Sequence, residues 1–224
     1  FAATENNFRV DKGSMISKKL HTKVTVERYN IEAEFEKEEK EEYIKYVPPS
    51  IGGLNINNNA ADFRNAANLC WNVSNRKIVE LAIGYIQHGE RIMIVAKDIN
   101  NQGILKNMLM NKGLHESYIF VINKENKIDY PYTDTRNYYV VITTPSYSEG
   151  YSLSKLGVMI TGVYFGNQAT REQLEGRINE PNQGRTKIII VIVHCGLLTY
   201  VLDKYENVRS LSAAVKEIGE KINQ

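Results

Sequence analysis

The chain has 224 residues and a mass of 25.6 kDa, enough to bury the core of one large domain or of one domain with an arm. Its 42% hydrophobic and 24% charged residues are ordinary for a globular protein. No apolar run reaches the ~20 residues of a membrane-spanning helix. The net charge is +2, but seven Glu against three Lys give residues 31–46 a charge of −4 and leave +6 for the rest. A mildly basic body is compatible with nucleic acid without requiring it.

The ends and the cysteines of the chain give limited information. Because it begins at Phe1 rather than Met and shows no secretory signal, we expect an excised fragment or processed product. We expect it inside a cell, in the cytoplasm or nucleus, or in a host cell or virion if it is viral. Cys70 and Cys195 lie far apart with no metal-like spacing, which favours two free thiols over a disulfide.

The first 49 residues are predicted to be a tail and a connector arm. Residues 21–35 alternate well enough for a strand, and the acidic residues 34–47 predict an exposed helix. A solvated face is the favoured interpretation of this charge run, with a partner-binding patch as the alternative. A segment rich in Pro, Gly and Asn follows and marks the clearest boundary in the sequence.

Residues 50–205 alternate between amphipathic and apolar segments, which predicts an α/β domain with a parallel sheet and helices on both faces. Ser74 and Asn75 can cap a helix that ends at Gly89, and a second helix is expected over 99–113. A last helix is expected within 206–224, packed on or beside the domain. The predicted strands are 91–96, 117–123, 138–143, 157–165 and 186–194. Ligands on such sheets collect at the carboxyl ends of the strands.

Several motifs of known chemistry are absent. The sequence contains no GxxxxGK[ST] phosphate loop, no HExxH, no paired CxxC and no GxSxG, and no metal site is predicted. His194 ends an apolar strand and is interpreted as a histidine at the core edge rather than a base.

Two segments remain as candidates. Residues 143–153, TTPSYSEGYSL, combine hydroxyl side chains with a flexible backbone at Gly150, which suits the binding of phosphate oxygens at a strand end. In the segment REQLEGRINEPNQ, Thr170 and Gln173 have capping-box spacing, and Gln173 and Arg177 share one helix face. A guanidinium there suits bidentate contact with phosphate. Taken singly, each segment is also compatible with an ordinary polar surface.

Together the segments resemble superfamily 2 helicases and translocases, in their C-terminal RecA-like domain. RIMIVAKD (91–98) is similar to motif IV, ITTPSYSEGYSL (142–153) to motif V and QLEGRINEPNQ (173–183) to motif VI, the most specific of the three. The resemblance covers about residues 70–202 and implies a RecA-like fold, with the strand and acidic helix as an N-terminal arm.

The resemblance also implies roles for individual residues. Lys97, Thr144 and Ser146 would contact the nucleic-acid backbone. Gly150, Ser152, Gln173 and Arg177 would lie on the ATP side, with Ser152 where the family more often has Asp or Asn, and Gln183 would match the trailing glutamine of the motif. Arg177 would act as an arginine finger.

Glu180 departs from the pattern, because it stands where the family has a second arginine finger. A carboxylate there adds repulsion where negative charge develops. Either hydrolysis is impaired, naturally or by an introduced change, or a neighbour such as Arg185 supplies the charge.

The function implied is the C-terminal half of a nucleic-acid-dependent ATPase, a helicase or translocase that uses ATP and Mg²⁺. Its expected partners are a DNA or RNA backbone and an N-terminal RecA-like domain of the same protein, and no membrane. The fragment alone is expected to bind no cofactor tightly and to be inactive. The alternatives are a catalytically lost RecA-like module that scaffolds nucleic acid or a protein, and the nucleotide-sugar-binding half of a glycosyltransferase, which would leave Q-x-x-G-R unexplained.

Overall fold

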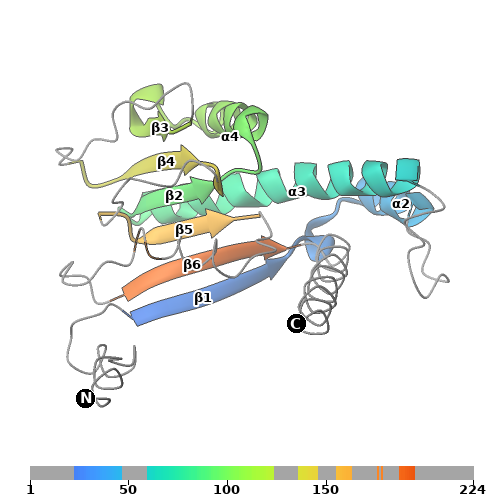
Figure 1. Ribbon diagram of the computed structural model, residues 1–224, viewed down its shortest axis with the longest axis horizontal. Helices are drawn as coiled ribbons and strands as arrows, with labels where there is room; N and C mark the ends of the chain where they lie inside the picture. Colours follow the sequence, from blue (N-terminus) through green and yellow to red (C-terminus); the bar gives the residue numbers. More distant parts are fainter. Residues whose placement is uncertain are drawn as a thin grey trace, which may run out of the picture.

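The computed structural model describes residues 23–46, 60–123, 136–145, 155–162 and 187–194, together with Gly176 and Ile178. These residues form one six-stranded sheet in the order β1-β6-β5-β2-β4-β3, in which all neighbouring strands are parallel (Figure 1). The strands are β1 (Lys23–Asn30), β2 (Arg91–Val95), β3 (Ile119–Val121), β4 (Tyr139–Thr143), β5 (Val158–Thr161) and β6 (Lys187–His194). The predicted parallel α/β sheet is confirmed, and its arrangement is consistent with a RecA-like fold.

Five helical segments accompany the sheet in the described part of the chain. They are the 3-10 turns η1 (Ile31–Glu34) and η2 (Glu116–Tyr118) and the α-helices α2 (Lys37–Tyr46), α3 (Ala60–Gln87) and α4 (Ile99–Asn111). The helix predicted over 99–113 corresponds to α4, and the acidic helix to α2. The strand predicted over 117–123 is shorter, because η2 occupies its first residues. The predicted C-terminal helix lies outside the described residues.

Side chains on the strands alternate between two apolar layers, as the period of two in a strand requires. On β2, Ile92 and Ile94 pack in the layer that contains α3 and α4, whereas Met93 and Val95 pack on the opposite face. Ile178, which is helical and 0% exposed, belongs to this second layer. Both faces of the sheet therefore bury apolar side chains, which explains why its strands are almost uniformly hydrophobic.

Helix α3 extends well past the sheet. Its 28 residues span about 42 Å, whereas a five-residue strand spans about 17 Å. Figure 1 shows the helix crossing the sheet and projecting beyond the carboxyl ends of the strands. The prediction that this helix begins at Ser74 and Asn75 is wrong, because both residues lie mid-helix and are 2% and 4% exposed. Their side chains face the sheet edge instead of capping a helix.

Strand β1 is part of the sheet, although the sequence placed it in a connector arm. It pairs with β6 over its whole length, from Lys23 opposite Lys187 to Asn30 opposite His194. The pairing satisfies its backbone groups on one side, and Tyr29 packs against the main apolar layer. The strand and acidic helix expected at this end are thus present, with the strand built into the sheet. The predicted boundaries at 49 and 205 stay predictions.

Strand β1 is also bonded to α3. The Tyr85 hydroxyl of α3 donates a hydrogen bond of 2.9 Å to the Glu27 carboxylate of β1. Burial, and then the adjacent carboxylate, raises the pKa of Tyr85 far above its ordinary value. The phenol therefore remains a protonated donor at physiological pH and holds the edge strand to the helix layer.

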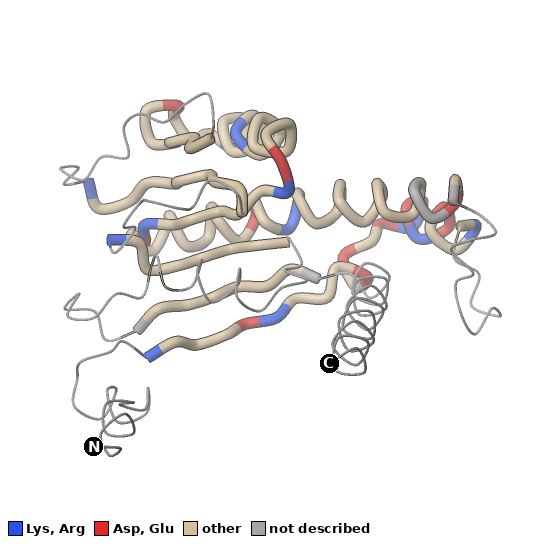
Figure 2. Tube along the Cα trace, in the orientation of Figure 1, with Lys and Arg blue, Asp and Glu red and all other residues tan. Residues whose placement is uncertain are grey.

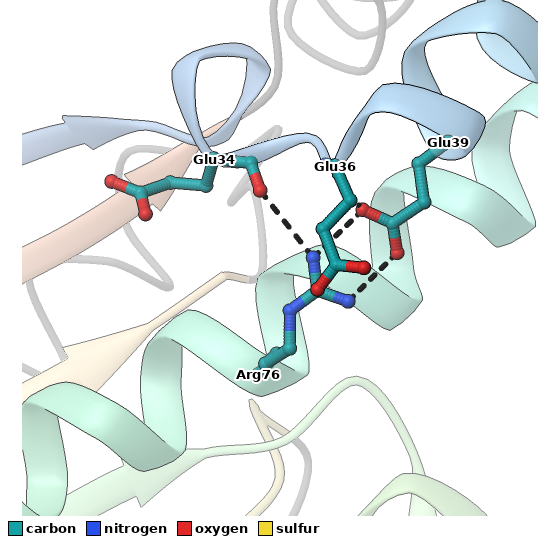
Figure 3. A network of polar contacts seen from close by, with 4 residues as sticks. All are labelled: Glu34, Glu36, Glu39 and Arg76. Atoms are coloured by element: carbon teal, nitrogen blue, oxygen red, sulfur yellow. Dashed lines mark hydrogen bonds and ion pairs between the residues drawn. The ribbon is translucent and has the colours of Figure 1, made fainter.

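The acidic segment docks on α3 through one arginine. Arg76 Nη1 and Nη2 each lie 2.7 Å from one carboxylate oxygen of Glu39 on α2, and Nη2 also donates to the Glu34 carbonyl at 3.4 Å (Figure 3). Lys77 lies 3.2 Å from the Glu34 carboxylate. Figure 2 shows acidic positions gathered on η1 and α2 beside α3. One side of the acidic helix is therefore bound within the molecule, while most of its charged residues are exposed, as expected for a solvated helix face.

The hydrogen bond from Arg76 lowers the pKa of Glu39, although partial burial opposes the shift. A double-mutant cycle with Arg76→Gln and Glu39→Gln is expected to give a coupling of about 0.5–1 kcal/mol in urea unfolding at pH 7. Because the folded pKa is depressed, this stabilisation is present above the unfolded pKa of about 4.3 and is lost as the pH falls through the folded value. Glu41→Gln, an exposed change on the same helix, is the control. A coupling that does not decrease as the pH is lowered below about 4 would contradict the prediction.

Candidate functional site at the carboxyl edge of the sheet

Three neighbouring strands end at the same level. Val95, the last residue of β2, pairs with Thr143 of β4 on one side and with Thr161 of β5 on the other. Adjacent strands lie about 4.8 Å apart, so the three ends occupy a front about 10 Å wide. Residues that follow these strands, among them Lys97 and Gly162, are brought together although they are far apart in the sequence.

The turn after β2 is held by buried amides. The Asp98 side chain caps α4 by accepting from Asn101 N at 2.8 Å, and Asn101 Oδ1 accepts from Lys97 N at 3.0 Å. Asn101 Nδ2 donates to Asn75 Oδ1 of α3 at 2.9 Å. Both asparagines are 4% exposed. These bonds fix the backbone of Lys97 relative to the middle of α3.

The Lys97 side chain carries the positive charge at this edge. Its Nζ lies 5.1 Å from the centre of the Trp71 ring and 3.8 Å from Asp98 Oδ2. The side chain is 40% exposed, so the ammonium remains accessible to an anion. Such a group is suited to contact with a phosphate.

Described residues that follow β2 and β5 in the sequence lie on opposite faces of the sheet. Helix α4, which follows β2, packs on the face covered by α3. Ile178, in the segment that follows β5, lies on the other face. The adjacent ends of β2 and β5 thus form a topological switch point, where the crevice between diverging connections binds ligands in open α/β sheets.

Helix α3 meets this edge at Gly162, the residue after β5. A Cβ at position 162 would clash with Ser74 Oγ and lie 3.2 Å from Ile78 Cδ1, so any larger residue would force these side chains to move. Within the described residues, Ser74 Oγ is the buried side-chain atom without a hydrogen-bond partner. A buried, unpaired hydroxyl costs free energy.

Gly162→Ala is expected to lower the free energy of unfolding by about 1–3 kcal/mol, because the added methyl group overpacks the contact. Ser74→Ala should be neutral or slightly stabilising, since it removes an unpaired hydroxyl. In the Ser74→Ala background Gly162→Ala should cost less, which a urea-unfolding cycle measures. Gly84→Ala serves as the control, because nothing lies within 4 Å of a Cβ there. Equal costs of Gly162→Ala in both backgrounds would show that the two positions do not clash.

A second buried amide joins α4 to β3 and β4. Gln102, 1% exposed, donates from Nε2 to the carbonyls of Ile122 at 2.8 Å and of Ile142 at 3.0 Å. Its Oε1 accepts from Asn123 Nδ2 at 3.0 Å. The carbonyls at the strand ends are therefore bound by a side chain of the helix that follows β2.

The structure places two of the residues predicted for the site. Lys97 and Thr144 both lie at the carboxyl edge, after β2 and β4; Thr144 is only 5% exposed, so Lys97 is the more accessible of the two. Their roles stay predictions. The other predicted site residues lie outside the described part of the chain, namely Ser146, Gly150, Ser152, Gln173, Arg177 and Glu180.

The residues that build this edge were not predicted to belong to a site, and Ser74 and Asn75 were predicted only as a helix cap: Trp71, Ser74, Asn75, Asn101, Gln102 and Gly162. A signal was available for the turn, because Asp98 precedes α4 at the position of an N-cap. No signal in the sequence could pair Asn75 with Asn101, because that contact depends on how α3 crosses the sheet.

Within the described ranges, no group of three His, Cys, Asp or Glu side chains could hold a metal ion. Cys70 is a buried thiol, and Cys195 lies outside the described residues. Of the helices that the structure describes, none is both long and apolar enough to cross a membrane.

Neither a protein-family model nor a curated protein matches this sequence. Among solved structures, the C-terminal part of the Fun30 ATPase domain is similar at a TM-score of 0.45 and 13% identity, over 53% of this chain and 40% of that one. The DUF1998 helicase MrfA bound to DNA has a TM-score of 0.43 and 16% identity, over 55% of this chain and 18% of that one. T4 UvsW has a TM-score of 0.44 and 13% identity, over 79% of this chain and 32% of that one. The chain spans less than half the length of each neighbour, and these partial likenesses assign no role to any residue.

Proposed function

We propose that this chain is the C-terminal RecA-like half of a superfamily 2 nucleic-acid-dependent ATPase, a helicase or translocase. The observation that carries the proposal is the common edge of β5, β2 and β4. The segments similar to motifs IV, V and VI begin at or follow these three strands, and Val95, Thr143 and Thr161 align their ends. The chain therefore leaves β2, β4 and β5 from one front about 10 Å wide.

The nucleic-acid backbone is proposed to bind at the ends of β2 and β4. Lys97 offers an exposed ammonium there, and Thr144 and Ser146 follow the neighbouring strand. Contacts of this kind neutralise phosphates and read no bases, so they account for binding without sequence preference. DNA and RNA are both compatible with them.

ATP is proposed to bind on the side of β5, against Gly150, Ser152, Gln173 and Arg177. With Mg²⁺ it supplies the phosphoryl group that is transferred to water. Arg177 would place a guanidinium against the charge that develops on the terminal phosphate, as an arginine finger does. The residues that would hold the metal ion and cradle the phosphates belong to the N-terminal RecA-like domain that we expect as the partner, because this sequence contains no phosphate loop.

Movement along the nucleic acid would come from closing and opening the cleft between this domain and the N-terminal RecA-like domain. A site assembled from two domains is complete only when they close, and hydrolysis lets them separate again. The strand held at the ends of β2 and β4 would move with this half. The chain alone is therefore expected neither to bind ATP tightly nor to hydrolyse it.

Glu180 favours a second candidate, a RecA-like module that binds nucleic acid or a protein and has lost catalysis. It places a carboxylate where a positive charge would stabilise the transition state. Binding at the ends of β2 and β4 needs no hydrolysis and would survive this change.

The deciding experiment measures ATP hydrolysis by the longer protein that contains this chain and its N-terminal half, with and without nucleic acid. If this chain is half of an ATPase, we expect ATP turnover that nucleic acid stimulates and that Glu180→Arg increases. Nucleic-acid binding without turnover, before and after that substitution, supports the binding module. Robust hydrolysis by the 224-residue chain alone would contradict the assignment to half a site. An unchanged rate after Glu180→Arg would show that position 180 is not a finger position.

A further inference from the structure

The single tryptophan of the chain stands at the switch point. Trp71 lies on α3 close to Gly162, the residue after β5, and its side chain is partly exposed. A Cβ at Gly162 would lie 3.6 Å from Trp71 Cζ3, an ordinary contact distance, so the end of β5 lies beside the edge of the ring. A large aromatic ring is therefore presented beside the ends of β2 and β5.

The Lys97 ammonium lies over the ring of Trp71. It is 5.1 Å from the ring centre and belongs to a side chain that is 40% exposed. The nearby Asp98 neutralises it only in part, because Asp98 caps α4 through Oδ1 and its Oδ2 stands 3.8 Å from Nζ. An aromatic ring beside an accessible cation is suited to binding nucleotides of a single strand, since the ring stacks on a base while the cation contacts its phosphate.

Hydrogen bonds hold the backbone around Trp71 and Lys97 in place, and one buried hydroxyl beside them lacks a partner. The bond from Asn101 to Asn75 holds the Lys97 turn to α3 one helical turn from Trp71. Ser74, three residues from Trp71 on the same side of the helix, buries a hydroxyl that has no partner. This orphaned hydroxyl, at 2% exposure beside Gly162, is a polar group that a ligand entering the switch point could satisfy.

We propose that Trp71 is a stacking position for an unpaired nucleobase, with Lys97 binding the adjoining phosphate. The inference rests on the proposed function and extends it, because backbone contacts alone do not distinguish single strands from duplexes. A base already stacked in a duplex is not available to the ring. The chain therefore binds a single-stranded stretch of DNA or RNA at this edge in preference to duplex.

The test uses the 224-residue chain, in which tryptophan emission, excited selectively over that of the tyrosines, reports on Trp71 alone. The probes are oligothymidylate and oligouridylate of about 12 nucleotides, an abasic strand of the same length and a duplex with the same number of phosphates. Both base-bearing strands are expected to quench the tryptophan emission. The abasic strand and the duplex should leave it nearly unchanged and, by anisotropy of labelled strands, bind about tenfold more weakly.

Variants separate stacking from a purely structural role of the ring. Trp71→Ala should weaken oligothymidylate binding about tenfold and leave abasic binding unchanged, whereas Trp71→Phe should keep most of the affinity. Lys97→Gln should weaken the base-bearing and the abasic strands alike. If Trp71→Ala does not fold, two other measurements test stacking: the quenching of the unsubstituted chain by each probe, and the affinity of Trp71→Phe for the base-bearing and abasic strands.

Three results would overturn the inference: equal loss for base-bearing and abasic strands in Trp71→Ala, binding of oligothymidylate without quenching, or quenching by duplex at the same affinity. Failure of every strand to bind would also overturn it. ATP hydrolysis by the longer protein, measured separately, then decides whether the proposed function still stands.

Discussion

Arg177→Ala is expected to lower nucleic-acid-stimulated ATP hydrolysis by about 10³–10⁵-fold in the longer protein. A guanidinium that contacts the terminal phosphate stabilises charge that develops only in the transition state, so its loss reduces the turnover number rather than the affinity for ATP. Steady-state hydrolysis at saturating ATP, together with the Michaelis constant, measures both quantities. The effect is the largest that we expect from any single change in this chain.

Arg171→Ala is the matched control, because it removes the same side chain from the same segment at a position outside the predicted site. It should leave turnover within about twofold of the starting protein, as expected for a residue that makes no transition-state contact. If Arg177→Ala behaves like Arg171→Ala, Arg177 is not a finger. If Arg185→Ala instead causes the large loss, the charge comes from that neighbour.

Gln102→Leu is expected to destabilise the fold by about 2–3 kcal/mol, the largest effect on stability among our predictions. The substitution preserves the approximate volume but removes both bonds to the carbonyls of Ile122 and Ile142 and the acceptor used by Asn123. Ile142 O retains the bond from Ile122 N at 2.9 Å, so the loss is less than that of two fully unpaired carbonyls.

Urea unfolding measures this loss, and the melting temperature should fall by about 4–12 °C for a chain of this size. Gln87→Leu, an exposed change at the end of α3, should shift stability by at most about 0.5 kcal/mol. Similar values for the two variants would mean that the amide of Gln102 contributes nothing beyond its volume.

The parallel sheet could be predicted because its strands are buried on both faces. Runs such as RIMIV and KIIIVIVH have no polar alternation, which is typical of strands covered on two sides. The start of α3 could not be located in the same way, because an Asn-rich stretch with weak helix propensity precedes it. Ala66, Cys70 and Val73 do have helical spacing, and the structure shows that they belong to the core.

The candidate site was predictable only in part. Lys97 and Thr144 could be placed at the carboxyl edge because they follow apolar strands, and the order of neighbouring strands then brings them together. The amides of Asn75 and Gln102 resemble surface residues in the sequence, because nothing local shows that they are buried. Trp71 lies well before the β2 strand, and its place at the switch point depends on the length and direction of α3.

The pairing of β1 with β6 has a consequence for how the protein folds during its synthesis. Lys23 pairs with Lys187, so the first described strand to leave the ribosome must wait for the last before it has a neighbour. Pairing between such distant segments slows folding and leaves a strand unprotected in the meantime. The charges of Lys23, Glu27 and Arg28 along β1 oppose premature pairing with another chain. Emergence of β6 from the ribosome, rather than completion of α3, is thus the event that allows β1 to join the sheet.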